Sequence, residues 1–456
     1  MNSINRANVN VSHRIALENP FLASYKKRTP KSRALFQRSQ TKLPGGNTRA
    51  AVYFQPYPLY LGRGKGYNVW DIDGNRYVDF HNNYTALILG HANPGVVRAV
   101  RERVADGTCF GAPSEYEYAL AELVSKRMQS IDKMRFCNSG TEATMYSLLT
   151  AKAFTGRTRI LKFEGAYHGT HESALVSTHP PAGSGYPIIP IPDVAGVSPS
   201  VLNDVLVARF NDQESVERVF RDHGKELAAL IVEPVMGSAG MIPAKKEFLK
   251  LLRELCTAND VLLIFDEVIT GFRLSMGGAQ EYYGVAPDLT ALGKNLGGGF
   301  PVGGYGGRED VMGLFDIVKV PKITLSGTFS ANPVTMAAGL ATLRQLNAAT
   351  YQRLDRMGKS LQNVWEQAIS DSHVPAVVSR AGSLLNIHFT RNEVVDYQSA
   401  KAEDSSLKSA FFLGMVVSGI FMAARGMAAI SVPMSNSEIK AFAKAADQTF
   451  AMLRKL

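Results

Sequence analysis

The chain has few cysteines and no long hydrophobic run, and each of these features excludes some classes of protein. Its 456 residues include three cysteines, Cys109, Cys137 and Cys256, which are far apart and form no CxxC pair. An odd and scattered set argues against a disulfide framework and a cysteine metal site, and it favours a reducing compartment. We therefore expect a cytoplasmic protein. The longest strongly apolar run, residues 410–424, is shorter than the roughly 20 residues of a membrane-spanning helix. We predict a buried helix there and no membrane segment.

Acidic residues are almost absent from the start of the chain. Residues 1–65 hold 12 basic residues and one acidic residue, Glu18, whereas the rest of the chain is close to neutral. A basic excess confined to one end argues against a nucleic-acid partner. We interpret residues 1–33 as a basic N-terminal extension. Organelle targeting by this segment is the alternative, although residues 1–30 show no clear amphipathic helix.

Strand and helix patterns alternate through the centre of the chain. Short apolar runs predict strands at residues 134–138, 159–163, 227–235 and 261–268. Residues 247–256 have the apolar spacing of a helix. Such alternation predicts parallel βαβ units, and we assign residues 95–340 to one large α/β domain.

The two flanks of this region have a different pattern. Residues 58–80 alternate around Asp73-Gly74, which predicts a hairpin. Strand-like residues 374–390 precede helical patterns at 404–424 and 436–453. We expect residues 34–94 and 341–456 to form a smaller α+β domain together.

Three groups of residues in the central domain are candidates for ligand binding or catalysis. Ser139, Gly140 and Thr141 stand between a predicted strand and helix, where free N–H groups and the helix dipole can hold a phosphate, although Ser and Thr also cap ordinary helices. Asp266 ends an apolar strand, at the edge where open α/β sheets bind ligands; a structural salt bridge is the alternative. Lys294 precedes a glycine-rich turn, and a lysine in an apolar site becomes a nucleophilic amine; a surface lysine is the alternative. This order of groups is what pyridoxal phosphate (PLP) requires.

Six ordered motifs give the chain a family resemblance. They are NSGTEA (138–143), FEGAYHG (163–169), VEPVMG (232–237), FDEVITGFR (265–273), PDLTALGKNLGGGFPVGG (287–304) and SGTFSANP (326–333). With these motifs the chain resembles the class III, fold type I, PLP-dependent aminotransferases from about residue 34 to residue 453. Within them it resembles the branch of the β-amino-acid (β-phenylalanine) aminotransferases and glutamate-1-semialdehyde aminomutase. The resemblance implies an α/β fold, with a large domain built on a mostly parallel, seven-stranded sheet and a smaller α+β domain formed by both termini.

The resemblance also implies roles for individual residues. It makes Lys294 the catalytic lysine that bonds to PLP, and Asp266 the partner of the pyridine nitrogen. The remaining cofactor-binding residues that it implies are Ser139, Gly140, Thr141, Tyr167, Glu233 and Thr328. Among these, Tyr167 lies on the cofactor ring and Thr328 reaches the phosphate of the neighbouring subunit, because the family builds its sites across a homodimer. The supporting roles of Glu233 and of His168 cannot be separated from packing. The motif His168-Gly169-Thr170-His171-Glu172 matches no zinc-enzyme pattern, and we expect no metal.

Two arginines indicate the substrate. Arg49 ends the PGxNxR pattern and Arg425 follows the apolar run 410–424. In the β-amino-acid branch, which this chain resembles at both places, the first arginine holds the carboxylate of a β-amino acid and the second that of an α-keto acid. Tyr84 also matches that branch. For Arg425, a helix-end side chain reaching solvent is the structural alternative.

The aminomutase pattern differs at these positions. It has two more residues before the first arginine, favours Trp near position 84, and carries Glu where this chain has Arg425. The loop 179–198 still resembles the gating loop of the aminomutase, and Ser238 replaces its Asn. We predict an aminotransferase that moves the amino group of a carboxylate-bearing amine, such as 3-amino-3-phenylpropionate, to 2-oxoglutarate or pyruvate with ping-pong kinetics. Glutamate-1-semialdehyde 2,1-aminomutase, or an aminotransferase for another amine, is the alternative.

Overall fold

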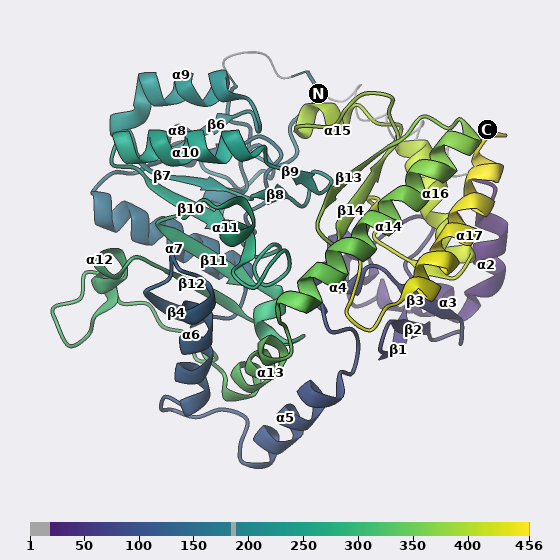
Figure 1. Cartoon of the computed structure of the whole chain (residues 1–456), viewed down its shortest axis with the longest axis horizontal. Helices are drawn as coiled ribbons and strands as arrows, with labels where there is room; N and C mark the ends of the chain where they lie inside the picture. Colours follow the sequence, from purple (N-terminus) through teal and green to yellow (C-terminus); the bar gives the residue numbers. More distant parts are fainter. Residues whose placement is uncertain (1–18, 184–187, 456) are drawn as a thin grey trace.

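A seven-stranded sheet forms the centre of the computed structural model, which describes residues 19–183 and 188–455 (Figure 1). The strand order is β4-β12-β11-β10-β7-β5-β6, and every strand except β12 runs in the same direction. The strands are β4 (Lys133–Cys137), β5 (Arg159–Phe163), β6 (Val205–Ala208), β7 (Leu227–Val232), β10 (Leu262–Asp266), β11 (Leu289–Gly293) and β12 (Gly303–Gly307). This confirms the mostly parallel sheet expected for the central region.

Helices cover both faces of this sheet, which explains why its central strands are apolar throughout. All residues of β7 are buried, and Leu230 and Val232 pack with α9 (Gln213–His223) and α10 (Lys246–Ala258). The alternate residues of the same strand pack with α7 (Gly140–Thr155) on the opposite face. A strand buried on both faces must be apolar at every position rather than at alternate positions.

Two further sheets lie outside the central one, and the two ends of the chain meet in the first of them. β1 (Leu61–Lys65), β2 (Asn68–Asp71) and β3 (Arg76–Asp79) form an antiparallel meander, and β15 (Ile420–Phe421) adds to it in parallel with β3. β13 (Val377–Ala381), β14 (Leu384–His388) and β16 (Met427–Ala429) form the second sheet. The predicted hairpin at Asp73-Gly74 is therefore confirmed. The domain boundaries themselves stay a prediction.

Long C-terminal helices pack beside these sheets (Figure 1). They are α14 (Ala348–Ser372), α16 (Ser405–Val417) and α17 (Asn436–Leu453), and their apolar faces share one core with the N-terminal strands. The other elements of the described residues are α2 (Leu22–Arg28), α3 (Pro30–Ser39), α4 (Asn82–Thr85), α5 (Pro94–Ala105), α6 (Glu115–Arg127), α8 (Pro199–Asp204), β8 (Val235–Met236), β9 (Ile242–Pro243), α11 (Gly278–Tyr283), α12 (Glu309–Met312), α13 (Pro333–Arg344) and α15 (Tyr397–Lys401), together with short 3-10 turns. Across residues 19–183 and 188–455, every helix is too short or too polar to cross a bilayer.

One predicted strand and one predicted helix end well before the expected residue. The strand predicted at 227–235 stops at Val232, because Pro234 has no N–H for the ladder and the carboxylate of Glu233 accepts backbone N–H groups instead. The helix predicted at 404–424 ends at Val417, where Gly419 takes a left-handed conformation at φ 86°. The rest of that apolar run forms β15 and a turn.

Candidate active site

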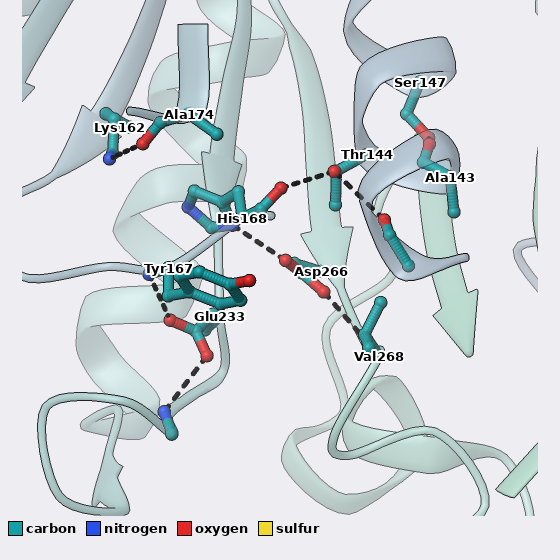
Figure 2. Close-up of polar contacts among 12 residues, drawn as sticks. Ala143, Thr144, Ser147, Lys162, Tyr167, His168, Ala174, Glu233, Asp266 and Val268 are labelled. Carbon is teal, nitrogen blue, oxygen red and sulfur yellow. Dashed lines mark hydrogen bonds and ion pairs between the residues drawn. The ribbon is translucent and has the colours of Figure 1, made fainter. Parts of the chain in front are cut away.

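Asp266 stands at the carboxyl end of β10, where it contacts a buried histidine (Figure 2). Its Oδ2 lies 2.8 Å from Nδ1 of His168, and its Oδ1 accepts a hydrogen bond from the Val268 N–H at 3.1 Å. Burial lowers the pKa of His168, although the carboxylate of Asp266 acts in the opposite direction. A neutral His168 can donate its Nδ1 hydrogen to the carboxylate of Asp266, which gives this buried side chain a hydrogen-bond partner.

The backbone of the Tyr167-His168 loop is tied to α7. Thr144 of α7 donates its hydroxyl to the carbonyl oxygen of His168 at 2.6 Å (Figure 2). Gly169 follows with φ 96°, and a Cβ there would lie 2.6 Å from Oγ1 of Thr141. Only glycine allows the loop to pass so close to the start of α7.

Glu233 joins the same loop to the segment after β7. Its carboxylate accepts the Tyr167 N–H at 2.9 Å and the Gly237 N–H at 3.0 Å (Figure 2). Burial, followed by the negative charge of Asp266, raises the pKa of Glu233 to about 7. The Tyr167 side chain is 41% exposed, so this large aromatic ring lies open beside Asp266 instead of in the core.

Lys294 follows β11, the strand next to β10. Its backbone is left-handed at φ 47°, an unusual conformation for lysine that turns the chain sharply at the end of the strand. Burial lowers the pKa of its amine to about 8, while the carboxylates of Asp266 and Glu233 act to raise it. An amine with this pKa is partly unprotonated near neutral pH and can act as a nucleophile.

Ser139, Gly140 and Thr141 form the start of α7 on the same side of the sheet. The Ser139 hydroxyl caps the helix by accepting the Glu142 N–H at 3.1 Å. A Cβ on Gly140 would lie 2.9 Å from the Val268 side chain, so the helix can begin this close to β10 only with glycine. The first N–H groups of a helix lack partners within the helix, and they attract an anion such as phosphate.

These groups together fit PLP. A nucleophilic lysine, a buried carboxylate and a helix start stand at the carboxyl ends of the parallel strands β11, β10 and β4, at the edge where such sheets bind ligands. Lys294 would bond to the cofactor, Asp266 would pair with its ring nitrogen and α7 would hold its phosphate. The structure brings these predicted residues together, while the role of each one stays a prediction.

The predicted substrate residue Tyr84 lies in a left-handed turn. Asn82, Asn83, Tyr84 and Thr85 have φ values between 48° and 74°. Asparagine tolerates this conformation, whereas for other L-residues it costs roughly 1–2 kcal/mol each. The turn is held by Asp79, whose Oδ1 accepts the N–H groups of His81 and Asn82. Such backbone strain is often found at functional sites.

The structure brings Arg49 and Arg425 to this tyrosine. Their guanidinium carbons lie 5.4 Å and 5.0 Å from the centre of the Tyr84 ring. Arg49 donates to Oδ1 of Asn83 at 2.9 Å, and Arg425 donates to Oγ of Ser238 at 3.4 Å. Within the described part of the chain, neither guanidinium forms an ion pair, and Nε of Arg425 is buried without a partner. The helix-end alternative for Arg425 is wrong, because the residue lies in the turn between β15 and β16.

Thr328 lies apart from these groups in a single chain. It is exposed, and its carbonyl oxygen lies 3.8 Å from Sγ of Cys109. The role that the resemblance implies for it, across a homodimer interface, stays a prediction. Four residues of the predicted gating loop, 184–187, lie outside the described residues.

Two residues that hold the loops of the site in place were not predicted from the sequence. One is Thr144, which has no signal beyond its place on α7. The other is Lys162 of β5, whose fully buried ammonium donates to the carbonyl oxygen of Ala174 at 2.9 Å (Figure 2). It also donates to the carbonyl oxygen of Val176 at 2.5 Å. A lysine inside the apolar strand RILKF was a readable signal, because a buried lysine needs buried acceptors. It fastens the segment that follows the Tyr167-His168 loop.

The fold and the site define a PLP-dependent transferase, and comparison with known proteins gives its family. Residues 50–436 match the model of the class-III aminotransferases, and the chain belongs to this family. It uses PLP as its cofactor.

Similar proteins within the family are named either aminomutases or transaminases. Glutamate-1-semialdehyde 2,1-aminomutase of Thermodesulfovibrio yellowstonii is 41% identical over 94% of this chain and 100% of its own. An omega-transaminase from Sphaerobacter thermophilus is 42% identical, with a TM-score of 0.90 over 93% of this chain and 98% of its own. A β-phenylalanine aminotransferase from Variovorax paradoxus is 34% identical, with a TM-score of 0.86 over 95% of this chain and 96% of its own.

Proposed function

We propose that this protein is an aminotransferase that moves an amino group between two carboxylic acids, with a β-amino acid such as 3-amino-3-phenylpropionate as donor and an α-keto acid as acceptor. The observation that carries the proposal is the pair of arginines at Tyr84, which have no acidic partner among the described residues. Arg425 is half-buried, and a guanidinium in such a place is costly without an anionic partner. A substrate carboxylate would satisfy it with charge-assisted hydrogen bonds, and the exposed Arg49 can bind a second carboxylate in the same way. The names of the Sphaerobacter and Variovorax relatives agree with this proposal.

Each residue of the site has a defined task in this reaction. When bound, PLP accepts the electron pair that remains when the amine-bearing carbon of the substrate loses its proton. Lys294, with its lowered pKa, is the base that takes up this proton and returns it. Asp266 keeps a negative charge at the ring nitrogen, and His168 orients that carboxylate. Arg49 and Arg425 bind the carboxylates of the substrates, away from the amine of Lys294.

The proposal is tested by the two half-reactions. We would record the absorbance of the purified holoenzyme while 3-amino-3-phenylpropionate is added without a keto acid. The band of the lysine-bound cofactor should fall, and it should return when 2-oxoglutarate or pyruvate is added. A spectrum that responds to neither the β-amino acid nor the α-amino acids glutamate and alanine would contradict an aminotransferase of this kind.

Glutamate-1-semialdehyde 2,1-aminomutase is the second candidate, and the curated relatives favour it over the β-amino-acid assignment. The Thermodesulfovibrio protein with this name matches over its whole length. An aminomutase moves the amino group within one molecule and consumes no keto acid. Turnover of glutamate-1-semialdehyde without a keto acid, together with no return of the absorbance band on adding 2-oxoglutarate or pyruvate, would establish this second candidate.

We also propose a homodimeric assembly and a cytoplasmic location. The first rests on the resemblance, which places Thr328 at the neighbouring subunit. The second rests on the scattered, unpaired cysteines. Sedimentation of the holoenzyme would test the assembly, and cell fractionation would test the location.

A further inference from the structure

The Tyr84 residue is held at its ring, its backbone N–H group and its hydroxyl group. The edge of the His81 ring lies against it, with 4.1 Å between the ring centres, and Nδ1 of His81 accepts the Tyr84 N–H at 3.3 Å. The phenol hydroxyl donates to the carbonyl oxygen of Ala51, two residues after Arg49. These contacts and the left-handed turn of the backbone restrain the position of the ring.

The two guanidinium groups near this ring differ in depth. Arg49 is exposed, whereas Arg425 is half-buried and lies against Ser238. Both lower the pKa of Lys294, and the effect of Arg425 is larger. Arg425 therefore acts more strongly on the reactive amine than Arg49 does.

The two proposed substrates need carboxylate sites at two depths. In an α-keto acid the carboxylate is bonded to the reacting carbon, whereas in a β-amino acid one further carbon separates them. An inner and an outer arginine match this difference of one carbon. The match rests on the function proposed above, which requires both acids to react at the same Lys294.

We propose that Tyr84 is a positioning residue for these two carboxylate sites, because its ring contacts both guanidinium groups and holds Arg49 and Arg425 at separate depths. Two guanidinium groups repel each other, and an aromatic ring attracts each of them through its electron-rich face. An aliphatic side chain in the same place offers no such attraction. Loss of the ring therefore weakens the binding of both acids rather than one.

The test measures each half-reaction separately in the holoenzyme. The rate of change of the cofactor absorbance is followed against the concentration of 3-amino-3-phenylpropionate, and then, for the amine-loaded form, against that of 2-oxoglutarate. In Tyr84→Leu the apparent Kd of both acids should rise about tenfold, with the maximal rates within about threefold of the wild type. Tyr84→Phe keeps the ring and should recover most of the lost affinity for both.

A matched control removes a similar contact elsewhere. Arg63 lies 4.9 Å from the ring of Trp70 in the N-terminal sheet, so Trp70→Leu loses an arginine–aromatic pair outside the site and should leave both apparent Kd values unchanged. An effect of Tyr84→Leu on one acid alone, or on the maximal rates with unchanged apparent Kd, would overturn the inference. Failure of the wild-type enzyme to react with either acid would instead overturn the proposed function.

Discussion

The cofactor side and the substrate side of the site are built differently. On the cofactor side, Asp266, His168 and Glu233 are buried, and their hydrogen bonds measure 2.8–3.1 Å. On the substrate side, Arg425 has a single 3.4 Å hydrogen bond and Arg49 is exposed. The first side is fixed before any ligand arrives, whereas the second leaves charged groups open for a substrate. We therefore expect the residues of the cofactor side to control the reaction, and those of the substrate side to control which acid binds.

The largest effect is expected at Lys294. Lys294→Ala removes both the amine that bonds to PLP and the base that moves the proton, so the rate should fall at least about a thousandfold. PLP should still bind, but reversibly and without the absorbance of the lysine-bound form. Single-turnover absorbance measures both effects, with the exposed Lys250→Ala as the control. Turnover near that of the wild type would show that the cofactor side is wrongly assigned.

A smaller loss is expected at Asp266. Asp266→Asn keeps the size of the side chain but removes its charge, and we expect a loss of roughly a hundredfold to a thousandfold in rate. Asp73→Asn is the matched control, because Asp73 accepts hydrogen bonds from Lys31 and Ser32 far from the sheet edge. Equal rates in the two variants would mean that the Asp266 charge has no catalytic role.

On the substrate side, the two arginines should separate the half-reactions. Arg49→Ala should raise the apparent Kd of the β-amino acid about tenfold to a hundredfold, and Arg425→Ala should do the same for the keto acid, because each loses charge-assisted hydrogen bonds. The absorbance of the cofactor should stay unchanged in both. Small and equal effects on the apparent Kd of both acids would mean that these arginines have structural roles only.

The last prediction changes no side chain and concerns pH. The pKa of Lys294 is lowered to about 8 by burial, and only the unprotonated amine reacts with PLP. The unprotonated fraction, and with it the rate of PLP uptake by the apoprotein, should rise about tenfold from pH 6 to 7 and about fivefold from pH 7 to 8, and then level off. A rate that keeps rising to pH 10 would indicate an ordinary, solvated lysine. Stopped-flow absorbance of apoprotein mixed with PLP gives this profile.

The cofactor side could be predicted from the sequence because its residues follow strands of one sheet. Parallel strands end at the same edge of a sheet, so Asp266, at the end of a predicted strand, was expected at a ligand-binding edge. The strand before Lys294, β11, was not among the predicted strands, and this lysine was recognised by the glycine-rich turn that follows it. Ser139 was readable because it stands where a strand passes into a helix. Local patterns and strand direction were sufficient for these residues.

The substrate side could not be derived in this way. Arg49, Tyr84 and Arg425 come from three distant segments, and no periodic pattern encodes a left-handed turn or the pairing of β15 with β3. The resemblance named these residues, but it gave no indication that the two arginines share one ring. Lys162 and Thr144 were missed because their effect depends on which carbonyl groups the fold brings to them.

The central claim is that the amino group leaves one acid and reaches another. The direct measurement uses 3-amino-3-phenylpropionate labelled with ¹⁵N, incubated with the holoenzyme and 2-oxoglutarate or pyruvate, followed by mass spectrometry of the products. The account predicts ¹⁵N in the newly formed glutamate or alanine, and none with Lys294→Ala. Label that stays in the donor, while glutamate-1-semialdehyde is converted without any keto acid, would contradict it.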